Sequence, residues 1–130
     1  MTAEDDRKSF EDKKARQAAR LGHDRGVLGH VRGTLRALDG YDYSYLWSWM
    51  GVPIIQLPAD VMGTQEIIWA TKPDVIIETG VARGGSVVFM AAMLELLGKG
   101  KGIGIDVDVR PHNRQTIEAH PMEKRIAVIE

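Results

Sequence analysis

Short apolar runs alternate with helical segments after residue 73, and this alternation is the clearest pattern in the chain. Residues 75–78 (VIIE) form a short, mainly apolar run that predicts a strand buried on both faces. A glycine-rich turn over residues 79–85 leads into residues 86–97, an almost wholly apolar helix candidate that Gly98 ends. The later predicted elements are a second buried strand, a short helix and a third strand, at residues 103–107, 116–119 and 125–130. This order is typical of the first half of a doubly wound α/β fold with a parallel sheet.

The first 40 residues carry a different pattern, that of charged helices. Residues 3–20 contain strong helix formers with Phe10 as the only large apolar side chain, so the predicted helix is solvated and needs a partner to be stable. Residues 26–38 predict an amphipathic helix closed by Gly40. Its apolar side chains recur at helical intervals, at Val27, Leu28, Val31, Leu35 and Leu38. We interpret residues 1–40 as a charged helical arm.

Residues 41–73 form a second arm, which is rich in aromatic side chains and proline. Aromatic residues recur with a period close to two within residues 41–49, which predicts an extended segment with one face against protein. Pro53 and Pro58 favour an irregular crossing after it, and Asp60 is a candidate N-cap of the helix that follows. Two interpretations stay open: the arm packs on a core or a second subunit, or it forms a wall or lid of a ligand pocket.

Composition and charge exclude several classes of protein. The chain has 130 residues, with 17 Lys+Arg, 18 Asp+Glu and a formal net charge of −1, which argues against nucleic acid or an anionic membrane as the main partner. It has no cysteine, so disulfides, thiolate metal sites and a cysteine nucleophile are excluded. No apolar run approaches the roughly 20 residues of a membrane span, and the charged N-terminus lacks a signal-peptide core. We therefore expect a soluble, cytoplasmic protein.

Candidate binding residues lie at the ends of the first two predicted strands. Ligands bind beyond the carboxyl ends of the strands in open parallel sheets, so the glycine-rich turn and the pair Asp106 and Asp108 should face one crevice. Gly80 lets the chain turn sharply, while Gly84 and Gly85 let the backbone approach a ligand where the helix opens. Asp106 could accept hydrogen bonds from both hydroxyls of a ribose. Together these residues predict an adenosine-containing cofactor.

Charge separates two such cofactors. The turn reads G-x-A-x-x-G, with Ala82 where a dinucleotide fingerprint has glycine, and Glu78 before it would repel a pyrophosphate by about 1–4 kcal/mol. S-adenosylmethionine instead brings cationic groups toward Glu78, and its carboxylate suits the helix N-terminus near Gly85 and Ser86. The residues favour S-adenosylmethionine over a nicotinamide dinucleotide. A plain tight turn, with Glu78 capping a helix or paired with Arg83, remains the structural alternative.

Four segments, WMGVPIIQLPAD, QEIIWATKPDVIIETGVARGGSVVFMAAML, GIGIDVDV and HPMEKRIAVIE, resemble the cephalosporin hydroxylase family, which includes rhamnosyl O-methyltransferase-like proteins. The resemblance covers residues 45–130 and implies a class I methyltransferase with a Rossmann-like fold, S-adenosylmethionine as cofactor, commonly a magnesium ion, and a homo-oligomer. It also implies that the cofactor turn is formed by Glu78, Gly80, Gly84, Gly85 and Ser86. Asp106 is implied to hold the ribose, with Asp108 as a second contact.

The same resemblance leaves the catalytic and metal residues unassigned. The acidic metal ligands of the family follow later strands than the three predicted here, so no residue of this chain is assigned to magnesium. Asp106 and Asp108 are metal ligands by type, but their place after the second strand favours the ribose role. The first strand of this topology belongs at the centre of the sheet, and with only three strands one side of it would be an unpaired edge. We therefore expect the chain to be the first half of a larger domain.

Three functions follow from these expectations. The favoured one is the cofactor-binding half of an S-adenosylmethionine-dependent O-methyltransferase that acts on a hydroxyl of a small molecule or sugar. The alternatives are a nicotinamide-dependent oxidoreductase, and a non-catalytic truncated piece that oligomerises or binds cofactor only weakly. Neither nucleic acid nor a membrane is an expected partner.

Overall fold

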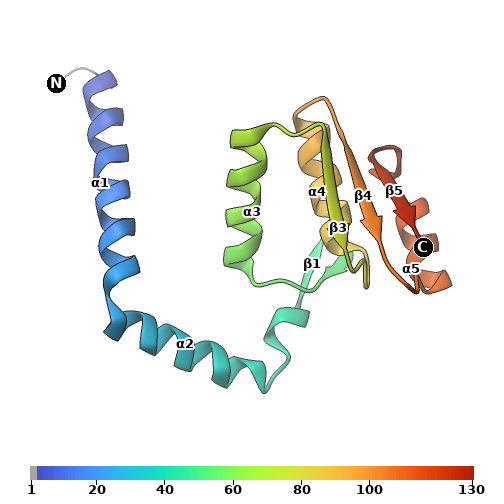
Figure 1. Ribbon diagram of the computed structural model, residues 1–130, viewed down its shortest axis with the longest axis horizontal. Coiled ribbons are helices and arrows are strands. Elements are labelled where there is room, and N and C mark those ends of the chain that lie inside the picture. Colours follow the sequence, from blue (N-terminus) through green and yellow to red (C-terminus); the bar gives the residue numbers. More distant parts are fainter. Residues whose placement is uncertain (1–2) are drawn as a thin grey trace. The chain divides into compact units, whose positions relative to one another are not determined.

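A computed structural model describes residues 3–130 (Figure 1). The chain divides into two compact units, Met1–Tyr41 and Asp42–Glu130, which are described separately. In the first, α1 spans Ala3–His23 and α2 spans Arg25–Asp39, so both predicted helices are confirmed. Asp24 caps α2, because its side chain accepts a hydrogen bond from the Val27 N–H at 3.0 Å.

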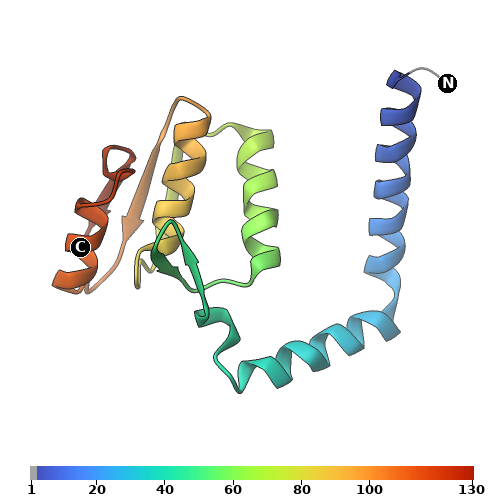
Figure 2. The same ribbon diagram turned by 180° about the vertical axis from the view of Figure 1, so that it is seen from behind.

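The second unit is built on a three-stranded, all-parallel sheet. Its strands are β3 (Val75–Thr79), β4 (Lys101–Ile105) and β5 (Ile126–Ile129), in the order β3-β4-β5. Helix α4 (Gly85–Leu96) connects the first two strands, and α5 (Pro111–Glu118) with the short η2 (Glu123–Arg125) connects the last two. Figures 1 and 2 show the three strands and their connecting helices from opposite sides. This partial Rossmann-like α/β fold, preceded by helices, is the predicted one.

Three details of the predicted α/β segment are wrong. Val75 and Ile77 of β3, predicted to be buried, are 51% and 63% exposed, because α4 packs on the opposite face of the strand, which carries Ile76. Strand β4 ends at Ile105, so Asp106 follows the strand instead of lying in it. Helix α5 begins at Pro111, earlier than expected, since proline suits the first position of a helix.

The arm that precedes the sheet forms a hairpin and a helix. Strands β1 (Trp47–Trp49) and β2 (Val52–Ile54) pair antiparallel, after the short η1 (Tyr43–Tyr45) and before α3 (Pro58–Thr71). The extended segment is therefore shorter than predicted, because Tyr43–Tyr45 form a 3₁₀ turn. The predicted cap is also wrong: Leu57 occupies the N-cap position, and Asp60 lies within the first turn.

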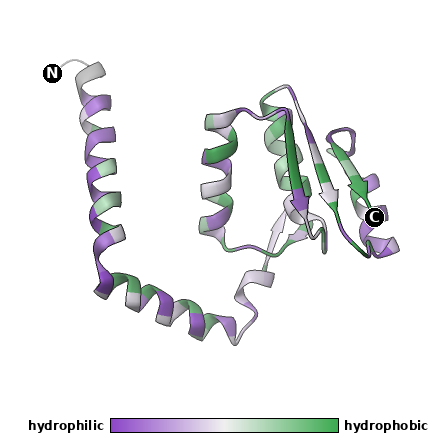
Figure 3. Ribbon diagram, in the orientation of Figure 1, coloured by the Kyte–Doolittle hydropathy of each residue, from purple (hydrophilic) through white to green (hydrophobic). Residues whose placement is uncertain are grey.

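Helix α4 is the centre of the core, and its apolar composition confirms the sequence prediction (Figure 3). One cluster joins Ile54 of the hairpin and Ile68 of α3 to Phe89 on α4. The Trp49 and Phe89 rings pack edge to face, with 4.8 Å between their centroids. A second cluster joins the turn, α4 and α5 through Val81, Val87 and Ile117. Burying one such side chain contributes about 1.5–3 kcal/mol.

Candidate functional site

The turn between β3 and α4 has a tightly defined backbone. Gly80 adopts a φ of +92°, and its N–H donates to the Ile105 carbonyl at 2.7 Å, which joins the turn to the end of β4. A Cβ at Gly80 would meet nothing within 4 Å, so the positive φ is what requires glycine there. Ala82 is also left-handed, with a φ of +48°. The sharp turn predicted at Gly80 is confirmed.

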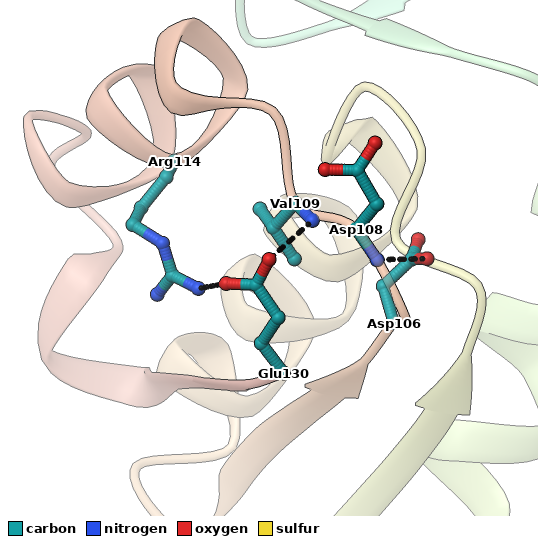
Figure 4. A network of polar contacts seen from close by, with 5 residues as sticks. All are labelled: Asp106, Asp108, Val109, Arg114 and Glu130. Atoms are coloured by element: carbon teal, nitrogen blue, oxygen red, sulfur yellow. Dashed lines mark hydrogen bonds and ion pairs between the residues drawn. The ribbon is translucent and has the colours of Figure 1, made fainter.

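Asp106 holds this turn from the neighbouring strand. Its Oδ2 accepts hydrogen bonds from the backbone N–H groups of Val81 at 2.7 Å and Ala82 at 3.2 Å. Its Oδ1 accepts one from the Asp108 N–H at 3.3 Å, while the Asp108 carboxylate points away from this contact (Figure 4). The bonds from Ala82, Val81 and Asp108 lower the pKa of Asp106, so it is ionised at neutral pH. Oδ2 uses both of its lone pairs in these bonds, whereas Oδ1 keeps one that could accept from a ligand.

Helix α5 supports the other side of the turn through residues that the sequence analysis did not single out. The buried Asn113 donates from Nδ2 to the Ala82 carbonyl at 2.8 Å. Glu130 accepts from the Val109 N–H at 3.3 Å and from Arg114 Nη2 at 2.7 Å, which anchors the start of α5 to the end of β5 (Figure 4). The only sequence signal for Asn113 was that it is a polar side chain two residues after Pro111, in the first turn of the helix.

At Gly84 and Gly85, neighbouring elements occupy the space that a side chain would fill. A Cβ on Gly84 would lie 2.7 Å from the Ile117 side chain, and one on Gly85 would lie 2.2 Å from the Pro53 carbonyl oxygen. Approach of a ligand to these glycines stays a prediction, and the structure adds that a side chain at either position would clash with α5 or β2. Gly85 therefore brings the hairpin backbone against the first residue of α4.

A cavity of about 90 Å³ lies at the start of α4. It brings together the predicted turn residues Glu78, Gly80, Gly84, Gly85 and Ser86. The arm adds Pro53, Ile55 and Gln56, so it both packs on α4 and forms a wall of the cavity. Asp108 lines a second cavity of about 270 Å³, which shares Ile55, Ala82 and Arg83 with the first. Asp106 reaches the turn through its hydrogen bonds.

Glu78 gives the smaller cavity its electrostatic character. Burial raises the pKa of this carboxyl, and hydrogen bonding from the Ser86 side chain offsets part of the rise. Its Oε2 is buried and has no hydrogen-bond partner among the described residues. A buried acceptor of this kind is stabilised by a cationic donor, whereas an anion placed beside it is repelled.

Residues 41–130 match the protein family described as rhamnosyl O-methyltransferase/CmcI. The chain belongs to this family. The match confirms the resemblance drawn from the sequence segments, and it includes the hairpin, the β3–α4 turn and all three strands of the sheet. Comparisons with curated proteins and with solved structures give no significant match.

Membership of the CmcI family makes O-methyl transfer the family-level chemistry of this fold. Among the side chains that the structure describes, those of residues 6–130, no group of three or more His, Cys, Asp or Glu is placed to hold a metal ion. The same described residues include no helix both long enough and apolar enough to cross a membrane. The candidate ligand-binding features of the CmcI-family chain are the β3–α4 turn and the two cavities beside it, with Glu78 and Asp108 in their walls.

Replacement of Asp106 by asparagine is expected to destabilise the Asp42–Glu130 unit at neutral pH. The amide has only one acceptor oxygen for three backbone donors, and the charge that strengthens those bonds is lost. Folding lowers the pKa of Asp106, so its ionised form stabilises the wild type at any pH above the ordinary pKa of 3.8. This contribution is lost as the pH falls through the lowered pKa of the folded state. The difference in unfolding midpoint between variant and wild type should be smaller at pH 3 than at pH 7.

Asp108→Asn is the matched control for the loss of one carboxylate. Equal unfolding midpoints of Asp106→Asn and the wild type at pH 7 would contradict the expectation.

Proposed function

We propose that this chain binds S-adenosylmethionine at the β3–α4 turn and serves the O-methylation of a hydroxyl on a small molecule or sugar. The observation that carries the proposal is the buried, unpartnered Oε2 of Glu78 in the wall of the turn cavity. Membership of an O-methyltransferase family supports the same chemistry.

The residues present fit this cofactor. Glu78 suits its ammonium group, and the first-turn amides of α4, at Gly85 and Ser86, suit its carboxylate, because a helix N-terminus offers unpaired N–H donors. Asp106 Oδ1 keeps one acceptor lone pair for a ribose hydroxyl, with Asp108 beside the second cavity. When bound, the cofactor supplies an electrophilic methyl group on its sulfonium. The residues of this chain bind and orient it.

A nicotinamide dinucleotide is the competing ligand, and the turn disfavours it. Its pyrophosphate would share the α4 N-terminus with the Glu78 carboxylate, at a cost of about 1–4 kcal/mol at short range. Ala82 adds a side chain where close backbone approach to pyrophosphate uses glycine. The proposal assigns no magnesium ligand and no catalytic base to this chain, and it includes the homo-oligomer that the family resemblance implies.

Calorimetric titration of the 130-residue chain with S-adenosylhomocysteine and with NAD tests the proposal. We expect S-adenosylhomocysteine to bind at least about tenfold more tightly, the ratio that 1.4 kcal/mol of repulsion produces. Tighter binding of NAD would favour the oxidoreductase and overturn the proposal. Binding of neither compound would favour a non-catalytic piece. Sedimentation of the same sample would test the homo-oligomer separately.

A further inference from the structure

Gln56 leaves a second unpaired acceptor in the cavity that holds Glu78. Gln56 lies between β2 and α3, and it lines both the 90 Å³ cavity at the β3–α4 turn and a cavity of about 240 Å³ beside Trp49. Its Oε1 is buried and, like Glu78 Oε2, has no hydrogen-bond partner among the described residues. Buried polar groups in native proteins are almost always paired, and each exception needs an explanation. Two such acceptors in the wall of one cavity point to a ligand that donates hydrogen bonds.

The surrounding chain holds Gln56 in this position. Three residues earlier, the Pro53 backbone lies against Gly85, so close that a Cβ there would sit 2.2 Å from the Pro53 carbonyl oxygen. Two residues later, Pro58 starts α3 with its φ fixed by the ring. The backbone segment that carries Gln56 is therefore held at both ends, which lowers the entropic cost of ordering this wall of the cavity around a ligand.

The two acceptors select one chemical class of ligand group. An ionised glutamate only accepts hydrogen bonds, and so does the carbonyl end of a glutamine amide. A carboxylate or phosphate has no donor to offer either oxygen. A primary ammonium has three N–H donors on one atom and can satisfy both acceptors at once. The pair therefore fits an ammonium group better than any anionic part of a nucleotide.

We propose that Gln56 is a specificity-determining residue whose Oε1 accepts a hydrogen bond from the ammonium group of the cofactor, alongside Glu78. This inference rests on the proposed function. It makes the hairpin arm part of the binding site, with the task of distinguishing ligands that carry the amino-acid portion from those that carry the adenosine alone.

Gln56→Met tests the inference, because methionine keeps the unbranched shape and loses the acceptor. The probes are S-adenosylhomocysteine and 5′-methylthioadenosine, which shares the adenosine and thioether but has no amino-acid group. We expect the variant to bind S-adenosylhomocysteine roughly tenfold more weakly, the usual effect of one hydrogen bond to a charged group, and to bind methylthioadenosine as the wild type does. Gln115→Met, on the exposed face of α5, is the matched control and should change neither affinity.

Two results with Gln56→Met would overturn the inference. One is unchanged binding of S-adenosylhomocysteine by Gln56→Met, and the other is an equal loss for both probes, which would make Gln56 only a structural part of the wall. Gln56→Glu keeps acceptor oxygens and adds charge, so it should retain or tighten S-adenosylhomocysteine binding even if the methionine variant fails to fold. Selective weakening in Gln56→Glu would overturn the acceptor role. A wild type that binds neither probe would overturn the proposed function itself, so the two failures are distinguishable.

Discussion

Substitution of Gly85 by alanine is expected to destabilise the Asp42–Glu130 unit by about 3 kcal/mol, the upper end of the usual cost of overpacking. The added Cβ would lie 2.2 Å from the Pro53 carbonyl oxygen and 2.7 Å from the Ile54 Cα. All of these atoms belong to the backbone, so no side-chain rotation relieves the clash. The β2 backbone must move away from α4, and with it Ile54, which belongs to the main core cluster.

Thermal unfolding followed by circular dichroism measures this effect. A loss of 3 kcal/mol corresponds to a midpoint lowered by roughly 12 °C or more, at about 4–8 °C per kcal/mol for a domain of 60–100 residues. Gly63→Ala in α3 is the matched control, because a Cβ there would meet nothing within 4 Å and alanine favours the helix. That control should raise the midpoint slightly. A Gly85→Ala protein as stable as the wild type would show that the hairpin does not press on α4.

The fold was predictable from the sequence wherever the pattern is local. Helix α4 is apolar on all sides and is followed by a glycine with a φ of +71°, so both its existence and its end could be predicted. The faces of β3 could not, because exposure of Val75 and Ile77 depends on which helices cover the sheet. The cap of α3 was assigned to the wrong residue because Pro58 makes a helix start on its own, without a side-chain cap.

In the candidate site too, the local contacts could be predicted from the sequence and the long-range ones could not. Glu78 and the turn glycines share one cavity because they are close in sequence, and Asp106 meets the turn because parallel strands end at one edge of the sheet. Gln56 and Asn113 were missed because they belong to segments far from the turn in the sequence, before α3 and on α5. The contact of Gly85 with the Pro53 backbone could not be predicted, since no local motif reveals it.

Replacement of Glu78 by glutamine is expected to change stability and binding in opposite directions. Burial raises the pKa of Glu78 in the folded state, so the folded protein binds more protons than the unfolded chain between the ordinary value of 4.5 and the raised value. Stability contributed by this group therefore falls as the pH rises through that range, and the cost of the buried charge persists above it. Glutamine carries no charge, so the ligand-free variant should be the more stable protein at pH 7, with an advantage that shrinks below pH 4.5. Unfolding midpoints measured across this pH range test the sign.

The affinity for S-adenosylhomocysteine should fall by roughly 10- to 100-fold in the same variant, because a hydrogen bond from an ammonium to a carboxylate contributes about 1.5–3 kcal/mol. Methylthioadenosine lacks the ammonium, so its affinity should stay unchanged. Glu118→Gln on the exposed surface of α5 removes the same charge elsewhere and should alter neither stability nor binding appreciably. A buried carboxylate kept only for structure would not combine greater stability with weaker binding on removal. A Glu78→Gln protein that is less stable at pH 7, yet binds S-adenosylhomocysteine normally, would therefore assign Glu78 to the turn and exclude it from recognition of the ligand.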